Sequence, residues 1–354
     1  MIQRRHFLGS VAAILASSTV SKLHASTPTG ALNWQNEIIE TVPHNNARRS
    51  PVVTGVSLQR GKGNLLAIVG DDHYVCLYDT VEERYTEHLD NHSDWIRTAK
   101  FSPDGSQLAT AGNDRKLLLW NSDRWDRPAI RQRHPEAIIE CAFSNDGKKL
   151  ATVGFERTLR IYDTKTGKSL QQLSCACPDN HAVAFSADDR SIAAAGRCGN
   201  IRVWDVASGK TTAQFKAHKK RIRSIDFAAD GKIISVSDDQ TVQITDPANT
   251  KNQRALPRLA SKLYSAALLS DGMLATGGSD NQIHVWQLND LQELGPLKGH
   301  TGTVTCLDYA SGQLVSGSYD THVRLWRTET SAPKQRTTKR TDESGPNGWN
   351  SRIK

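Results

Sequence analysis

Residues 92–120, HSDWIRTAKFSPDGSQLATAGNDRKLLLW, set the pattern that the rest of the chain repeats. The stretch predicts two short strands joined by a Pro-Asp-Gly turn at 103–105, followed by a tight turn into a third strand. Four residues stand apart from the apolar alternation of these strands: His92, Thr110, Asp114 and Trp120. One such unit is a weak signal, so its repetition decides the fold.

The unit recurs seven times at intervals of 40–42 residues. The position of Trp120 is filled by Tyr78, Trp120, Tyr162, Trp204, Thr245, Trp286 and Trp326. The tight-turn position, six residues earlier, holds Asp72, Asp114, Glu156, Cys198, Asp239, Asp280 and Asp320. The histidine position is filled at His92, His134, His218 and His300. Seven correlated matches indicate one repeat architecture rather than chance.

These units resemble those of the WD-repeat β-propeller family, and the resemblance covers residues from about 36 to 327. It implies an all-β fold, a seven-bladed β-propeller of four-stranded antiparallel blades. In the family, the turn aspartate accepts a hydrogen bond from the histidine, whose other nitrogen meets the Thr or Ser hydroxyl, and the hydroxyl accepts from the indole N–H. Only the second and seventh units keep this whole relay: His92, Thr110, Asp114 and Trp120, and His300, Ser316, Asp320 and Trp326.

The number of strands predicts how the ring closes. The last unit ends its third strand near Arg327, and no suitable fourth strand follows it. Residues 36–42 form a strand-like stretch followed by His44, as the fourth strand at 214–216 is followed by His218. We therefore expect the N-terminal strand to close the last blade, which leaves no open edge between blades.

Both ends of the chain read as segments outside the propeller. Residues 1–25 carry Arg4 and Arg5, a short apolar run and small residues, the order of a twin-arginine export signal cleaved after Ala25. The alternative is an uncleaved N-terminal anchor, although the apolar run is too short to span a bilayer. Residues 328–354 are polar and basic and predict a disordered tail. The chain carries a formal charge of +8, and without its two ends only +2 remains. This balance argues little for nucleic-acid binding by the propeller itself.

No catalytic, cofactor or metal motif is found. The recurring His, Ser/Thr and Asp are expected to be structural, because a hydrolase needs a single activated nucleophile beside an oxyanion site. Cys175 and Cys177 are followed by Pro178, so the haem-attachment motif is missing. Cys76, Cys141 and Cys306 fall within predicted strands and are expected to be buried and inert.

The fourth unit departs from the repeat. Its histidine position is Ala176, between Cys175 and Cys177, and its turn position is Cys198. Intact units bring these two positions together, so we expect a disulfide to Cys198 in an oxidising compartment. Cys177 is the preferred partner because Pro178 fixes the chain direction after it. Three unrelated thiols in a degenerate blade are the alternative.

Binding is the route to function that remains. In the family, partners engage the face that carries the inter-blade loops and the tight turns, here called the loop face. We expect a basic surface from Arg197 to Tyr264 to meet an acidic partner, unless the charges at Lys219, Lys220 and Arg221 belong to a solvated loop. The candidate positions on this face are Trp95, Arg97, Asn113, Arg197, Arg221, Arg223, Lys262, Tyr264 and Tyr319.

The sequence therefore predicts an exported, non-enzymatic and monomeric scaffold without a cofactor, which binds a protein partner. A propeller enzyme or redox-accessory protein with an unrecognised cofactor site is the alternative, and stoichiometric metal or a chromophore in purified protein would favour it. Nucleic-acid binding through the tail is a third possibility, which a steep salt dependence lost on deleting residues 328–354 would reveal.

Overall fold

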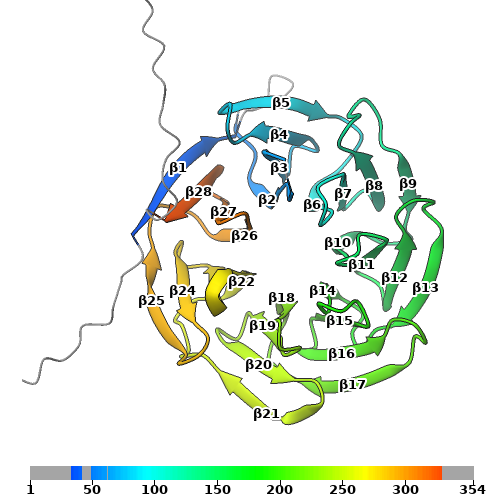
Figure 1. The fold of residues 1–354 in the computed structure, drawn as a ribbon, viewed down its shortest axis with the longest axis vertical. Coiled ribbons are helices and arrows are strands. Elements are labelled where there is room, and N and C mark those ends of the chain that lie inside the picture. Colours follow the sequence, from blue (N-terminus) through cyan, green and yellow to red (C-terminus); the bar gives the residue numbers. More distant parts are fainter. Residues whose placement is uncertain (1–32, 42–48, 62, 329–354) are drawn as a thin grey trace, which may run out of the picture. The chain divides into compact units, whose positions relative to one another are not determined.

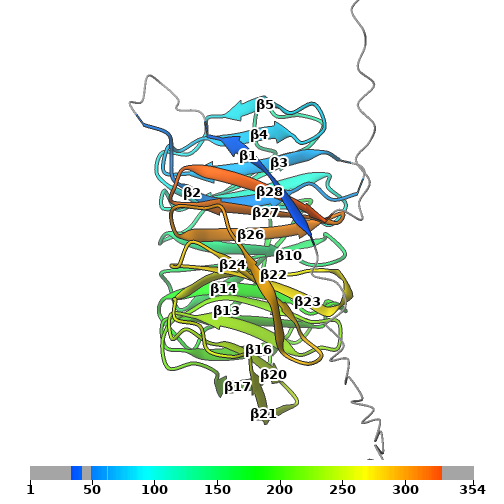
Figure 2. The ribbon, with the colours of Figure 1, turned by 90° about the vertical axis from the view of Figure 1, so that its left-hand side faces the viewer.

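The computed structural model describes residues 33–41, 49–61 and 63–328. In this part of the chain, 28 strands form seven four-stranded antiparallel sheets. The sheets are arranged as blades around a central axis (Figures 1 and 2), and the first strand of each blade contacts the first strand of the next. The predicted seven-bladed propeller is confirmed.

Each blade runs from an inner strand to an outer one. The inner strands are β2 (Val53–Leu58), β6 (Ile96–Phe101), β10 (Ile138–Phe143), β14 (Asn180–Phe185), β18 (Ile222–Phe227), β22 (Leu263–Leu268) and β26 (Val304–Ala310). The second strands are β3 (Leu65–Gly70), β7 (Gln107–Gly112), β11 (Lys149–Gly154), β15 (Ser191–Gly196), β19 (Ile233–Ser237), β23 (Met273–Gly278) and β27 (Gln313–Ser318).

The third strands are β4 (Val75–Asp79), β8 (Lys116–Asn121), β12 (Thr158–Asp163), β16 (Asn200–Asp205), β20 (Val242–Asp246), β24 (Ile283–Gln287) and β28 (His322–Thr328). The outer strands are β5 (Arg84–Leu89), β9 (Ile130–Arg133), β13 (Ser169–Ser174), β17 (Thr211–Lys216), β21 (Asn249–Ala255), β25 (Gln292–Leu297) and β1 (Trp34–Glu40). A single 3₁₀ turn among the described residues, η1 (Ser270–Gly272), precedes β23.

The ring is closed by the two ends of the propeller, as predicted. Strand β1 pairs antiparallel with β28, with Trp34 opposite Thr328 and Glu40 opposite His322. The strand begins and ends two residues earlier than the expected stretch 36–42. Ile39 of β1 is buried in one cluster with Val323 and Leu325 of β28 and with Val53 of the first blade. The first and last blades are therefore joined by a shared apolar core as well as by backbone pairing.

The turns between first and second strands have a local cause. In the second blade, the Ser102 hydroxyl donates to Asp104 and accepts from the Gln107 N–H, and Asp104 also accepts from the Ser106 N–H. Gly105 follows with φ 73°, a conformation that costs glycine little. The same Ser-x-Asp arrangement recurs at Ser144 and at Ser186. These short-range bonds hold the hairpin turns of the second, third and fourth blades.

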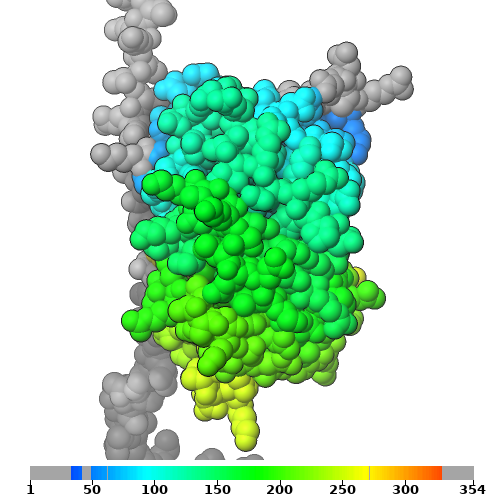
Figure 3. Space-filling view, turned by 90° about the vertical axis from the view of Figure 1, so that its right-hand side faces the viewer, coloured from blue at the N-terminus to red at the C-terminus, as the bar shows by residue number. Residues whose placement is uncertain are grey.

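The core lies between blades rather than inside any one of them. A representative cluster joins Val75 and Leu89 of the first blade to Phe101 and Trp120 of the second. Each blade buries both faces in this way, which explains why alternation along the strands is imperfect. Figure 3 shows the outer wall as a continuous surface from which the hairpin of β20 and β21 projects.

Candidate functional site

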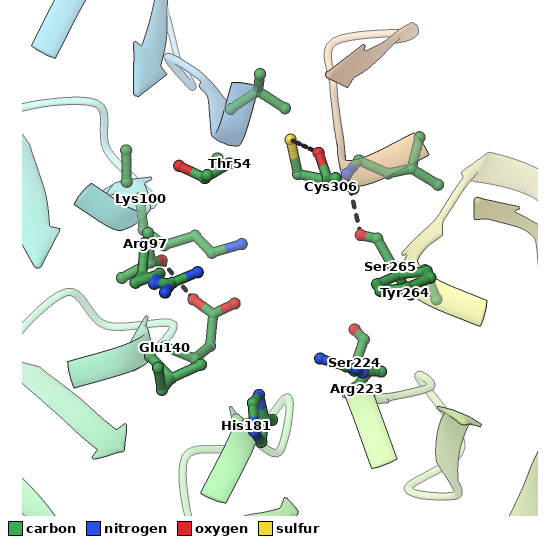
Figure 4. A pocket seen from close by; sticks show the side chains of 18 of the residues that line it. Thr54, Arg97, Lys100, Glu140, His181, Arg223, Ser224, Tyr264, Ser265 and Cys306 are labelled. Carbon is green, nitrogen blue, oxygen red and sulfur yellow. Dashed lines mark hydrogen bonds between the residues drawn. The ribbon is translucent and has the colours of Figure 1, made fainter. Parts of the chain in front are cut away.

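A register shift at the start of every inner strand leaves one residue per blade outside the regular pairing with the second strand. Such β-bulges re-aim side chains and often lie beside functional sites. All seven bulge residues line one central hollow of about 360 Å³ (Figure 4). They are Thr54, Arg97, Ile139, His181, Arg223, Tyr264 and Thr305. We call this hollow the central mouth; it opens on the loop face, because the inner strands begin beside the tight turns.

The structure brings most of the sequence candidates together at this mouth. Arg97, Arg221, Arg223, Tyr264 and Tyr319 line it. Trp95 and Asn113 lie behind Arg97, one under its guanidinium and the other bonded to it. Arg197 and Lys262 are exposed on the same face but do not line the mouth.

Two of the three arginines at the mouth are neutralised by carboxylates. Arg223 donates from Nε and Nη2 to the two oxygens of Asp238, at 2.8 and 3.2 Å. Arg221 donates from Nη2 to Asp179 at 3.2 Å. The guanidinium of Arg223 also lies 4.9 Å from the ring centre of Tyr264. These pairs make the surface from Arg197 to Tyr264 less basic than the sequence indicates.

Arg97 differs from the other two. Its Nε donates to the amide oxygen of Asn113 at 2.9 Å, and its guanidinium lies 5.1 Å from the ring centre of Trp95. Burial lowers the pKa of Arg97, while Tyr319 and Asp94 oppose that shift. An arginine remains a cation under these conditions. Among the described residues, the mouth therefore holds one arginine whose guanidinium contacts no carboxylate.

Exposed aromatic side chains surround the same opening. Trp95, Phe155 and Tyr319 are 36%, 45% and 48% exposed, which is unusual for such large side chains. Phe155 and Tyr319 occupy the same turn position as Asn113, in the third and seventh blades. Phe155 packs edge-on against His181, with ring centres 6.2 Å apart. Aromatic residues next to arginine are the usual composition of binding hot spots.

His181 forms the only histidine–carboxylate pair at the mouth within the described residues. Its Nε2 lies 2.6 Å from Asp179 Oδ1. Burial and the nearby Arg221 and Arg223 outweigh that carboxylate and lower the pKa of His181 to about 4. The imidazole is therefore neutral at pH 7.

Below the mouth, the channel carries a band of charge. Glu140 accepts from the Thr98 hydroxyl at 2.5 Å and from the Cys141 N–H at 2.9 Å, and it raises the pKa of Lys100. A second hollow of about 420 Å³ shares Lys100 and Glu140 with the mouth and is also lined by Asp226. Burial raises the pKa of Asp226 to about 6. Lys100 and Glu140 therefore lie where the two hollows meet, and the lower hollow also carries charges of both signs at Arg60, Asp226 and Asp308.

The relay residues lie apart from both hollows. In the second blade, His92 Nδ1 donates to Asp114 at 2.9 Å, the Thr110 hydroxyl bonds His92 Nε2 at 2.9 Å, and the Trp120 indole donates to Thr110 at 3.0 Å. The seventh blade repeats these contacts through His300, Ser316, Asp320 and Trp326. Every polar group of the set is used internally, so the relay acts as a structural strut.

Variant blades replace parts of the relay. In the third, the Tyr162 hydroxyl lies 2.9 Å from His134 Nε2. Tyr162 stands at the tryptophan position, and its hydroxyl bonds the histidine directly, which in complete relays is done by the Thr or Ser hydroxyl. In the fifth, His218 bonds Ser235 and Asp239, although Thr245 stands at the tryptophan position. The strut is therefore assembled from different residues around the ring.

In the fourth blade a disulfide joins Cys177 to Cys198, with Cα atoms 5.8 Å apart. It spans the inter-blade loop and the tight turn, where other blades use a histidine and an acid. Cys175 is buried beside it in the core, and burial raises its pKa to about 12. A thiol with so high a pKa is unreactive at neutral pH.

The expectation that all three strand cysteines are buried is wrong for Cys306. Cys76 and Cys141 are buried, but Cys306 is partly exposed and lines the mouth. It directly follows the bulge residue Thr305 at the start of β26.

Sequence reasoning missed His181, Phe155 and Glu140. His181 lies five residues after the histidine position of its unit, as Arg97 does, and Phe155 directly precedes the turn acid Glu156. These are the offsets that place Arg97 after the histidine position and Asn113 before the turn acid, so the repeat pattern could have identified both residues. Glu140 follows a bulge residue, and no sequence signal marks it.

Within the described residues, no group of three or more His, Cys, Asp or Glu side chains could hold a metal ion. The same residues include no helix of the length and apolarity that crossing a membrane requires. The predicted export signal at 1–25 lies outside the described residues, as does the predicted tail 328–354 apart from Thr328, which ends β28.

Comparison with known proteins agrees with the repeat pattern. The family model described as "WD domain, G-beta repeat" matches residues 83–121, 128–163, 170–205, 209–246 and 291–327, which is more than half of the chain. The blades that it leaves out wholly or in part have the same four strands.

Individual relatives are similar only over short stretches. Mitochondrial division protein 1 of Schizosaccharomyces pombe is 44% identical over 55 residues, which cover 16% of this chain and 8% of that protein. U3 snoRNP-associated protein-like EMB2271 of Arabidopsis thaliana is 39% identical over 66 residues, covering 18% and 14%. THO complex subunit 6 homolog of Danio rerio is 37% identical over 65 residues, covering 18% and 20%. The matches thus span no more than a fifth of these relatives.

Proposed function

This chain belongs to the WD40-repeat family, and from that premise we propose that it is an exported, non-enzymatic scaffold that holds a protein partner on its loop face. WD40 propellers typically serve as platforms for protein interaction. The observation that carries the proposal is the central mouth, where bulge residues from all seven blades converge beside exposed Trp95, Phe155 and Tyr319. A rigid ring of this kind presents its binding residues already ordered, so little conformational entropy is lost on binding.

The chemistry at the mouth favours binding over catalysis. Its one histidine–carboxylate pair among the described residues is His181 and Asp179, and Arg221 also donates to Asp179. The serine- and threonine-containing relays use their hydroxyls internally, as at Thr110. A side chain poised as an activated nucleophile is therefore not found among the described residues of the mouth.

Export is the second part of the proposal. The twin arginine at Arg4 and Arg5 supports it, and the disulfide between Cys177 and Cys198 is of the kind that persists in oxidising compartments. Replacing both arginines by lysine should retain the protein inside the cell in a fractionation experiment. Equal export of that variant would contradict the twin-arginine route.

The partner surface is tested by a photo-crosslinking amino acid placed at Tyr319 on the loop face. A matched protein carries it at Lys148, which is exposed in the turn between β10 and β11 at the opposite end of the channel. We expect a protein adduct in cells from the Tyr319 position alone. Equal adducts from both positions, or none from Tyr319, would refute the loop face as the partner site.

A further inference from the structure

Arg97 has donor capacity that the fold does not use. Its Nε bonds Asn113, yet neither of its Nη atoms donates to an acceptor within the described residues. Arg223, the equivalent bulge residue three blades away, spends both Nε and Nη2 on Asp238. The guanidinium of Arg97 thus presents its Nη N–H groups at the mouth, whereas the corresponding face of Arg223 is occupied by Asp238.

The fold also holds this guanidinium in place. Asn113 anchors Nε from the tight turn of the same blade, and Trp95 supports the plane of the group from the inter-blade loop. The bulge after Ile96 fixes the backbone from which Arg97 projects. An arginine restrained in this way loses little freedom when it binds a ligand, and its planar fork matches the two oxygens of a carboxylate.

The surroundings restrict what accompanies the carboxylate. Tyr319 lies near enough to act electrostatically on Arg97, and Trp95 and Phe155 are exposed on the same face. Asp94 acts electrostatically on Arg97 without an ion pair between them, and Glu140, which also lines the mouth, accepts from the Thr98 hydroxyl and the Cys141 N–H rather than from Arg97. A peptide with an acidic residue beside apolar ones would match both the charge and the aromatic surface. A hollow of about 360 Å³ accommodates one or two such side chains.

We infer that the central mouth binds an acidic–hydrophobic peptide segment of the partner, with a side-chain carboxylate on the Nη atoms of Arg97 and a neighbouring apolar side chain against Tyr319 and Phe155. This inference rests on the proposed scaffold function and specifies its ligand. It assigns the charge recognition to Arg97 of the second blade, rather than to Arg221 and Arg223, which already have carboxylate partners.

The test uses fluorescein-labelled peptides of seven residues, acetylated and amidated so that no terminal charge contributes. A central glutamate is flanked by each apolar or aromatic residue in turn, and every peptide has a glutamine counterpart. Binding to the full chain is measured by fluorescence polarisation. We expect glutamate peptides to bind about 10- to 100-fold more tightly than their glutamine counterparts, the usual difference for a charge-assisted bidentate contact.

Variants identify the residue responsible. Arg97→Gln should remove the preference for glutamate, and Arg97→Lys should keep only a small part of it because lysine lacks the fork. Lys220→Gln removes the same charge from an exposed position on the same face and should leave the preference unchanged. Asn113→Ala removes the hydrogen bond that anchors Arg97 Nε. This variant should bind the glutamate peptides more weakly and the glutamine peptides with little change. Melting curves establish that each variant is folded.

Each outcome decides the inference. Equal binding of glutamate and glutamine peptides, a preference that survives in folded Arg97→Gln, or no binding of any peptide would overturn it. Tighter binding of a phosphoserine peptide than of the glutamate peptide would also overturn it, in favour of a phosphorylated partner. If Tyr319 adducts form in cells and persist in Arg97→Gln, the scaffold function stands and only the carboxylate assignment fails.

Discussion

Replacing Asp114 by alanine removes an acceptor on which several donors converge. Its Oδ2 accepts from His92 Nδ1 at 2.9 Å and from the Ser93 N–H at 3.1 Å, and its Oδ1 accepts from the Lys116 N–H at 3.1 Å. The side chains of His92 and Asp114 are 0% and 2% exposed. Alanine would therefore leave the His92 N–H buried without an acceptor, and water cannot easily replace the lost carboxylate.

The size of the effect follows from the environment of the carboxylate. Burial raises the pKa of Asp114, but the hydrogen bond and charge of His92, with the two backbone N–H groups, outweigh burial and lower it from 3.8 to about 2. A shift of that size corresponds to about 2 kcal/mol of stability at neutral pH. Leaving a buried donor unsatisfied costs about 1–3 kcal/mol. We therefore expect Asp114→Ala to lower the free energy of unfolding by about 2 kcal/mol at pH 7.

The assay is urea unfolding followed by tryptophan fluorescence at pH 7 and at a series of lower pH values. Because the pKa of Asp114 is depressed on folding, its contribution is complete above about pH 4 and is lost as the pH falls toward 2. The difference between wild type and variant should shrink over that range. Asp123→Ala, an exposed change in the same blade, should stay within about 0.5 kcal/mol of wild type. If Asp114→Ala is as stable as Asp123→Ala at pH 7, the relay is not a structural strut.

Three further predictions concern other parts of the ring. Deleting residues 34–40 exposes Val323 and Leu325 and should lower Tm by about 6–12 °C. Deleting residues 1–32 is the control and should leave Tm unchanged. Equal Tm values for the two deletion variants would refute closure by β1. Unreduced, denatured protein should contain four thiols, six would eliminate the disulfide, and Cys198→Ser should cost about 3 kcal/mol. Burial lowers the pKa of His284, but hydrogen bonds to Asp280 and Glu293 outweigh burial and raise the pKa above 6.5. The contribution of His284 to stability is therefore complete below pH 6.5 and is lost as the pH rises through the folded-state pKa. An NMR titration of His284 with a midpoint below 6.5 would contradict that sign.

The strand repeats were predictable because their causes are local, and ring closure was predictable from their number. The turn at Asp104-Gly105 and the alternation that leads to Trp120 are short-range signals, and each blade repeats them. Seven copies then require closure, and the strand-like stretch before His44 was the segment available to provide it. Cys177 and Cys198 could be paired for the same reason, since they occupy positions that the repeat brings together.

The candidate site could be predicted only in part. Counting from the histidine position identified Arg97, Arg223 and Tyr264, because a fixed repeat places equivalent residues at equivalent points of the ring. The count could not show that these residues project from β-bulges into one hollow. A bulge depends on the pairing of two strands and leaves no mark in the spacing of apolar residues.

The sequence by itself determined the number of blades, their order and the face on which arginine and aromatic residues gather. Only the tertiary structure decided which of those arginines keeps an open guanidinium. Arg221 meets Asp179, which lies 42 residues away in the neighbouring blade, whereas Arg97 meets an amide oxygen. Charge compensation acts over a few ångströms in space, so it depends on which blades are neighbours and on how each side chain is turned, and neither is written in the local pattern.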